Sequence, residues 1–195
     1  EHADAGDGLL TQGAYTDWAD SVGRTGKILY TNVLYWKALD GLGFVEKADR
    51  VKTAVNTHFW RDDLGYFITS KKHEMLSSDG NLLAIAWGLA TPAQADQILN
   101  RMVEFGMADP VPTQVTNEAY PNKLIAIENR LGGIGHYHTH AAWLWLGGWH
   151  IVALARAGHK AEAQAMCQRA SAAIVRDGVV HEVYDRDGAY LSTRW

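Results

Sequence analysis

The run AAWLWLGGWHIVALARA, residues 141–157, is apolar on almost every side, and the run HKAEAQAMCQRASAAIVR, residues 159–176, follows it after Gly158. The first pattern predicts a helix that is buried all round. The second predicts a helix with one wet face, because its apolar residues recur every three or four positions. Gly158 suits the end of the first helix, since glycine readily adopts the left-handed conformation found there. Together the two runs predict a helical hairpin with one buried and one half-buried helix.

The same alternation occurs twice earlier in the chain. Residues 27–41 and 80–90 are apolar on most faces, whereas 44–60 and 92–105 have a single apolar stripe. Thr91 and Gln94 predict a capping box before the last of these helices. Inner helices of a toroid contact neighbours on both sides, while its outer helices face water. We therefore predict an all-α fold, about half of an (α/α)6 toroid, with inner helices near 27–41, 80–90 and 140–157 and outer helices near 44–60, 92–105 and 159–176. An open stack of helical hairpins, like a solenoid, is the alternative.

Length and charge set further bounds. The chain has 195 residues, a net charge of −4 and one cysteine, Cys167. No basic patch suits a nucleic acid or a membrane surface, and the longest apolar run is shorter than the ~20 residues of a membrane span. There is no phosphate loop, dinucleotide fingerprint or serine nucleophile elbow. We expect one partial catalytic domain over residues 1–195, truncated at both ends, with the missing half of the barrel in the same polypeptide as a partner.

The toroid also predicts where chemistry occurs. Loops that enter inner helices gather at one end, and here they are residues 13–27, 71–80, 132–140 and 179–190. Hydrolysis of a glycosidic bond needs one carboxyl that donates a proton and one that acts as base or nucleophile. Asp17 or Asp20 in the first loop and Glu182 in the last are candidates, and Asp79 lies in the second loop. Helix caps and ion pairs are the simpler interpretation of such carboxylates.

The segment His136-Tyr137-His138-Thr139-His140 has alternating histidines. On a strand the three imidazoles would share one face, as in some zinc sites. No cysteine lies nearby and no fourth ligand is evident, so hydrogen bonding to a polar substrate or capping of the next helix is the preferred interpretation. We predict neither a metal nor another cofactor.

Several of these segments resemble one known family in order and approximate spacing. Asp17-Trp18-Ala19-Asp20-Ser21, then Arg24-x-Gly26-Lys27 and the run YTNVLYWKAL at 30–39, resemble the TWMDA, RxGK and VEVNALWYNAL segments of glycogen-debranching amylo-α-1,6-glucosidases. Neutral and alkaline invertases carry a similar stretch. LATPAQ at 89–94 resembles a helix junction of those enzymes, Tyr137-His138 with Trp143 resembles YHNGxxW, and Glu182-x-Tyr184-Asp185 resembles EYYD.

The resemblance implies an inverting glycoside hydrolase that cleaves an α-glucosidic or related bond of an oligosaccharide or glucoside. The family's acid falls on Asp20 and its base on Glu182. We expect Asp20 to be buried against Trp18 and the inner helices, which suits a carboxyl that must hold its proton. The residues predicted to contact sugar are Asp17, Trp18, Asn32, Asp79, Tyr137, His138 and Tyr184.

Departures from the family concern its usual substrate more than its chemistry. Thr139 and His140 replace Asn-Gly, and His181 replaces the proline often found before the base. Two other function classes stay open. One is a non-catalytic carbohydrate-binding or scaffold toroid. The other is a lyase, epimerase or lanthionine-type cyclase on the same fold, which would use the histidines and tyrosine of residues 136–140.

Overall fold

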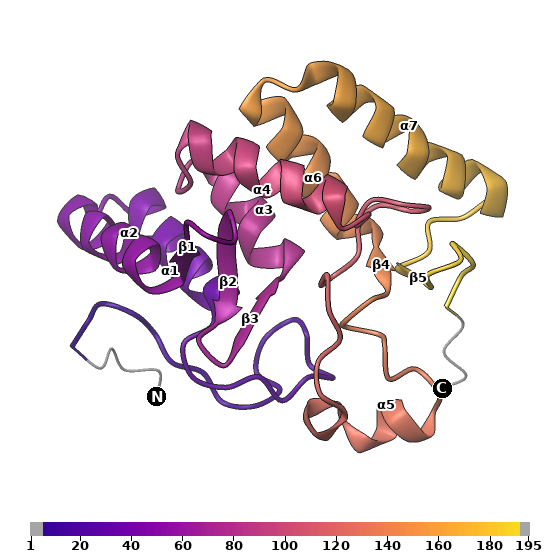
Figure 1. Ribbon diagram of the computed structural model, residues 1–195, viewed down its shortest axis with the longest axis horizontal. Coiled ribbons are helices and arrows are strands. Elements are labelled where there is room, and N and C mark those ends of the chain that lie inside the picture. The colour runs from indigo at the N-terminus through magenta and orange to yellow at the C-terminus, as the bar shows by residue number, and fades with distance from the viewer. Residues whose placement is uncertain (1–5, 192–195) are drawn as a thin grey trace.

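The computed structural model describes residues 6–191, which form three helical hairpins in two layers (Figure 1). Helix α3 packs against both α1 and α6, and these three helices make up the inner layer. In the outer layer α2 packs on α1, α7 packs on α6, and α4 packs on α6 and strand β2. The hairpins are α1 (Leu29–Gly41) with α2 (Val45–Phe59), α3 (Ser78–Trp87) with α4 (Pro92–Glu104), and α6 (Leu144–Ala157) with α7 (Lys160–Asp177). This arrangement confirms the predicted partial toroid and all six predicted helices.

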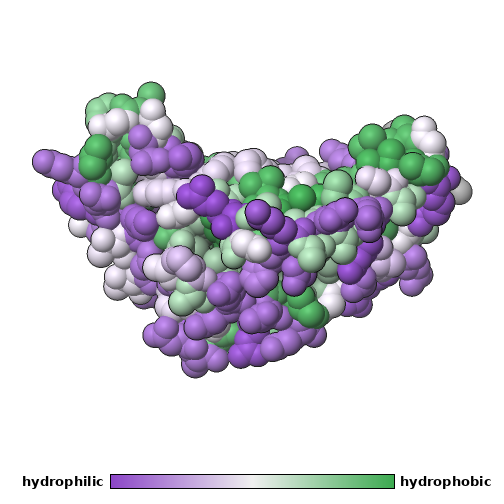
Figure 2. Space-filling view, turned by 90° about the horizontal axis from the view of Figure 1, so that it is seen from above, coloured by the Kyte–Doolittle hydropathy of each residue, from purple (hydrophilic) through white to green (hydrophobic). Residues whose placement is uncertain are grey.

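The middle inner helix differs from its two neighbours in burial. Every residue of α3 from Ser78 to Ile85 is buried, because α1 and α6 lie on either side. Helices α1 and α6 keep exposed apolar residues, among them Leu34 and Val152. The prediction of all-round burial therefore holds for α3 and is wrong for α1 and α6, which form the two edges of the inner layer. In Figure 2 the molecule has a crescent outline, hollowed on one side, with hydrophobic residues at both tips.

Short strands connect the hairpins. Strands β1 (Trp60–Arg61), β2 (Tyr66–Ser70) and β3 (His73–Leu76) form an antiparallel sheet in that order. All five residues of β2 are buried, since α1, α2, α3 and α4 surround it. Strand β3 leads directly into α3. Loop 71–80, which the sequence places before an inner helix, contains β3.

A second pair of strands joins loops that are far apart in the sequence. Strand β4 (Ala142–Trp143) pairs antiparallel with β5 (Val183–Tyr184). Helix α6 therefore begins at Leu144, later than the predicted residue 140, because the residues before it form turns and then β4. In loop 179–190 the strand β5 is confined to these two residues. The long loop 106–135 contains the 3-10 turn η1 (Asn122–Leu124) and α5 (Ile127–Leu131).

Individual helix ends follow the predicted local rules. Thr91 and Gln94 form the capping box at the start of α4, with Pro92 in the first turn. Gly158 ends α6 in the left-handed conformation, with φ of 93°. Ala163 and Met166 of α7 are buried as expected, whereas Ala170 and Ile174 are only half-buried. Local sequence thus sets the start of α4 and the end of α6.

Candidate active site

A buried arginine organises the loop that precedes α1. The Nε of Arg24 donates to Asp17 Oδ2 at 2.8 Å, and its Nη2 donates to Asp79 Oδ2 at 2.8 Å. The indole Nε1 of Trp18 donates to the same oxygen of Asp79 at 2.7 Å. Arg24 and Asp79 have no exposed side-chain surface, and Asp17 has 5%. We call Asp17, Trp18, Arg24 and Asp79 the Arg24 cluster.

Arg24 and Asp79 hold one another in charged form. Burial opposes the charge of Arg24, but Asp79, Tyr120 and Asp17 hold its pKa well above its usual value. Burial likewise opposes the charge of Asp79, yet the guanidinium of Arg24 keeps the pKa of that carboxyl below its usual range. Asp17 accepts further hydrogen bonds from Gln12 Nε2 at 2.7 Å and from the backbone N–H of Ala19 at 2.9 Å. The two carboxylates predicted to contact sugar are therefore occupied by protein donors.

Asp20, the predicted acid, lies outside this cluster. Its side chain is 76% exposed, and its Oδ1 lies 3.8 Å from Nδ1 of His138. The expectation that Asp20 is buried against Trp18 is therefore wrong for the part of the chain that the structure describes. The tight turn at residues 17–22 explains the difference, since the N–H of Val22 bonds the carbonyl of the fully buried Ala19 and leaves Asp20 on the outer side.

Glu182, the predicted base, meets Tyr137 beside the β4–β5 pair. The hydroxyl of Tyr137 donates to Glu182 Oε2 at 3.1 Å. Burial raises the pKa of the Tyr137 hydroxyl well above its usual value, and the negative charges of Glu182 and Asp20 raise it further. Glu182 thus contacts Tyr137, and Asp20 lies beside the next residue, His138. We call Asp20, Tyr137, His138 and Glu182 the rim group.

An aromatic cluster lies between the rim group and the Arg24 cluster. Trp18 meets His138, Trp143 and Trp145 edge to face, with ring centroids 5.0, 5.3 and 4.7 Å apart. His138 stacks on Trp143 at 4.9 Å, and its Nδ1 shares a hydrogen bond of 2.8 Å with Ser21 Oγ. Burial, helped by the charge of Arg24, lowers the pKa of His138 to about 3, so this imidazole is neutral at pH 7. Edge-to-face pairs of this kind add stability beyond their buried area.

Two predicted sugar contacts lie away from these groups. Asn32 is fully buried, and its side-chain amide bonds the backbone of Leu10 and of Ile28. Tyr184 packs in a separate core cluster with Val111, Ala142 and Ala173. The structure therefore brings together Asp17, Trp18, Asp20, Asp79, Tyr137, His138 and Glu182, and not Asn32 or Tyr184.

The importance of Arg24, Ser21 and Trp145 was not predicted. For Arg24 the sequence did hold a signal, because a carboxylate beside buried helices needs a cation and Arg24 is the arginine in the same loop as Asp17. For Ser21 and Trp145 no such signal existed, since both meet their partners only through the tertiary fold.

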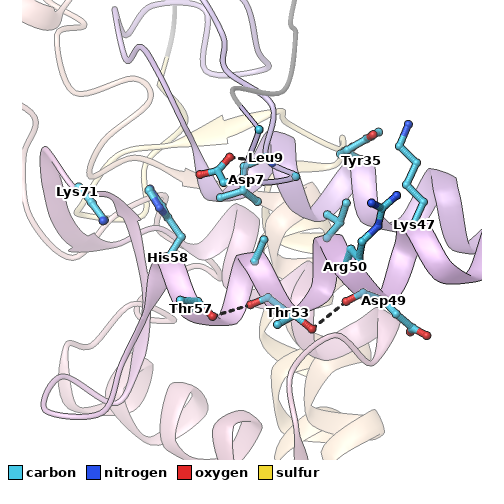
Figure 3. Close-up of a pocket in the computed structure, with 14 residues that line it drawn as sticks. Asp7, Leu9, Tyr35, Lys47, Asp49, Arg50, Thr53, Thr57, His58 and Lys71 are labelled. Atoms are coloured by element: carbon cyan, nitrogen blue, oxygen red, sulfur yellow. Dashed lines mark hydrogen bonds between the residues drawn. The ribbon is translucent and has the colours of Figure 1, made fainter.

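Other features of the described residues bear on ligands. In residues 6–191 no group of three or more His, Cys, Asp or Glu side chains is placed to hold a metal ion. No helix in that range is both long and apolar enough to cross a membrane. A groove of about 630 Å³ runs along α2, and Figure 3 shows Thr53, Thr57 and His58 of that helix along it, with Lys71 at one end. This groove contains none of the predicted site residues.

Comparison with known proteins gives matches only among solved structures. No protein-family model matches the chain, and no curated protein sequence does. A rhamnosidase from Klebsiella oxytoca with rhamnose bound matches 98% of the chain with 15% identity and a TM-score of 0.68. A GH63 mannosylglycerate hydrolase from Thermus thermophilus matches 84% with 17% identity and a TM-score of 0.64, and the neutral trehalase of Saccharomyces cerevisiae matches 84% with 16% identity and a TM-score of 0.58.

These proteins are much longer than the chain. It spans 34% of the rhamnosidase, 41% of the mannosylglycerate hydrolase and 35% of the trehalase. At such low identity the likeness concerns the fold and does not extend to the bond that each enzyme cleaves. The three hairpins of this chain are part of the (α/α)6 toroid on which these glycosidases are built.

Proposed function

We propose that the chain forms part of the active site of an inverting glycoside hydrolase, with Asp20 as general acid and Glu182 as general base. One observation carries this proposal. Two carboxylates from opposite ends of the sequence meet the adjacent residues Tyr137 and His138. Glu182 Oε2 accepts from the hydroxyl of Tyr137 at 3.1 Å, and Asp20 Oδ1 lies 3.8 Å from Nδ1 of His138. Paired carboxyls beside aromatic side chains are the groups that glycoside hydrolysis requires.

The proposed reaction is a single displacement. Asp20 donates its proton to the glycosidic oxygen as the bond to the anomeric carbon breaks. Glu182 removes a proton from a water that attacks that carbon on the opposite face, and inversion needs the two carboxyls roughly 6.5 to 9.5 Å apart. Tyr137 keeps its proton, because its pKa is raised, and orients Glu182 through their hydrogen bond. Trp18 and its aromatic neighbours form the apolar wall of the sugar site.

We also propose that further hairpins of the same polypeptide complete the toroid. Helix α1 has exposed apolar residues along one stripe, Leu34, Ala38 and the following Leu42, and α6 has Val152 and Ala155. Inner helices of a closed toroid bury such stripes against their next neighbours. The same completion would remove water from around Asp20, which a general acid needs in order to keep its proton near neutral pH.

The substrate proposed is an oligosaccharide or glucoside with an α-glucosidic or related bond. The resemblance to glycogen-debranching enzymes and invertases in Asp17 to Leu39 supports this choice. A carbohydrate-binding protein without catalysis is the second candidate, and the exposure of Asp20 favours it. The raised pKa of Tyr137 speaks against a lyase or epimerase that would use this phenol as its base.

The test uses the full-length protein and a panel of α-glucosides, with release of reducing sugar as the readout. Asp20→Asn and Glu182→Gln are each expected to lower kcat by at least about 100-fold, the usual share of general acid or base catalysis. Asp40→Asn is the matched control, since Asp40 is exposed on α1 and pairs with Lys37 of the same helix. NMR of the first-formed anomer tests inversion, and the 195-residue chain alone is expected not to cleave.

Wild-type activity that persists in both carboxylate variants would overturn the assignment. Sugar binding by the full-length protein without any cleavage would support the carbohydrate-binding candidate instead.

A further inference from the structure

One oxygen of Asp79 fixes the position of Trp18. Asp79 Oδ2 accepts from the indole of Trp18 at 2.7 Å and from Nη2 of Arg24 at 2.8 Å. Its other oxygen accepts from the backbone N–H of Gly80 at 2.6 Å. Asp79 lies in the first turn of α3, where the helix dipole favours a negative charge. The carboxylate is therefore held rigidly by an inner helix on one side and by Arg24 on the other.

Trp18 links Asp79 to the rim group. Its ring contacts His138 and Trp143 edge to face, and two residues later in the chain stands Asp20. Ser21 in turn bonds Nδ1 of His138, and His138 follows Tyr137 directly. A shift or rotation of the indole would therefore displace both the turn at residues 17–22, which contains Asp20, and the loop that contains Tyr137.

The arginine cannot be replaced by another cation in this arrangement. Arg24 donates from Nε to Asp17 and from Nη2 to Asp79, and its Nη1 lies 3.4 Å from the hydroxyl of Tyr120. Three donors in three fixed directions are a property of the planar guanidinium, whereas the ammonium of lysine is a single point charge. The fork thus joins the loop before α1, the start of α3 and the long loop 106–135.

We infer that Arg24 and Asp79 are positioning residues of the candidate active site: they set the orientation of Trp18 and, through it, of Asp20 and His138, and they do not contact sugar. The catalytic part of this inference rests on the proposed glycosidase function. The structural part, that Asp79 holds the Trp18 indole, stands without it. It replaces the predicted role of Asp79 as a sugar contact.

The test has two readouts on the full-length protein. The first is the indole N–H resonance of Trp18 in protein with ¹⁵N-labelled tryptophan, assigned by its loss in Trp18→Phe. Asp79→Asn and Arg24→Lys are expected to move this resonance and to speed its exchange with solvent. Trp87→Phe is the matched control, because Trp87 packs on Trp149, away from the site.

The second readout separates kcat from KM on the best glucoside. A displaced reacting group costs about 10- to 100-fold in rate, so Asp79→Asn and Arg24→Lys should lower kcat by that factor with KM changed less than about 3-fold. Trp18→Phe should lower kcat by a similar factor, and because Trp18 also forms the wall of the proposed sugar site, its KM is not used in the test. Trp18→Phe keeps the buried ion pairs, so it tests the same hydrogen bond if the charge variants do not fold. Trp87→Phe should keep wild-type kcat.

An unmoved indole resonance in Asp79→Asn would overturn the inference. A rise in KM at unchanged kcat in Asp79→Asn or Arg24→Lys would also overturn it, because that result indicates a sugar contact. If the wild-type protein cleaves no glucoside, the proposed function fails. The indole resonance then still decides whether Arg24 and Asp79 position Trp18.

Discussion

Asp17 and Asp20 lie in one tight turn, yet the side chain of Asp17 is 5% exposed in the Arg24 cluster and that of Asp20 is 76% exposed in the rim group. Asp17 is bound by a guanidinium, an amide and a backbone N–H. Asp20 instead lies 3.8 Å from the imidazole of His138 and faces water. A buried carboxylate without partners is costly, so the three donors around Asp17 stabilise the fold, whereas Asp20 is exposed to solvent. One short loop thus contains both a structural and a candidate catalytic carboxylate.

The largest expected effect tests the buried half of this comparison. Arg24→Met leaves Asp17 and Asp79 buried without their cation, and removal of one partner of a buried pair costs about 3 to 5 kcal/mol. We expect the free energy of unfolding, measured by urea denaturation, to fall by about that amount. Lys37→Met, which breaks the exposed pair with Asp40, should cost less than about 1 kcal/mol. Equal losses of unfolding free energy in the two variants would show that the buried pairs of Arg24 stabilise the fold no more than an exposed pair does.

A smaller effect tests the burial of His138, which lies between the two carboxylates' surroundings and packs on Trp18 and Trp143. The pKa of His138 is lowered from 6.5 to about 3, so the unfolded chain binds a proton at a pH where the folded protein does not. Stability therefore falls as the pH drops below 6.5, and the decrease from His138 should be about 2 kcal/mol by pH 5. In His138→Asn, whose amide can replace the Nδ1 hydrogen bond to Ser21, this part of the pH dependence should vanish.

His150 provides the matched comparison for that experiment. It is buried on α6, bonds Thr113 Oγ1 at 2.9 Å, and burial lowers its pKa to about 4. His150→Asn should flatten the same pH range in the same direction. A His138→Asn variant with the wild-type slope between pH 6.5 and pH 5 would show that His138 titrates normally.

The smallest expected effect concerns the rim group, the more exposed of the two groups compared. Tyr137→Phe removes one hydrogen bond to Glu182, and such a bond contributes about 0.5 to 1.5 kcal/mol. We expect a loss of unfolding free energy at the low end of this range, together with reduced kcat in the full-length protein. Tyr15→Phe is the control, because Tyr15 is an exposed tyrosine of the loop before α1. A loss of unfolding free energy as large as that of Arg24→Met would show that Tyr137 has a structural role like that of the Arg24 cluster.

Much of the fold could be predicted from local patterns. The apolar runs and stripes predict all six long helices to within a few residues, and the capping box at Thr91 is confirmed. What the patterns could not predict is how many neighbours each inner helix has. Periodicity marks a face as apolar, but only the arrangement of hairpins determines that α3 is covered on both sides while Leu34 of α1 stays exposed.

The candidate site, too, could be predicted in part from the sequence. The sequence placed Trp18, Asp20, Tyr137, His138 and Glu182 in loops at one end, and the structure brings them together. The prediction that Asp20 is buried was wrong. Asn32 and Tyr184 were predicted to belong to the same site, but they lie elsewhere. Residue type and loop position are properties of the sequence, whereas the direction of a side chain depends on turns and strand pairs that bring distant segments together.

By itself, then, the sequence determined the six long helices, the capping box of α4 and the glycine that ends α6, because these depend on interactions between residues a few positions apart. Only the tertiary structure decided which carboxylates are structural. Arg24 meets Asp79 across 55 residues and Trp18 meets it across 61, and no local pattern contains that pairing. Burial then makes each partner indispensable, since a charge removed from water must be paired.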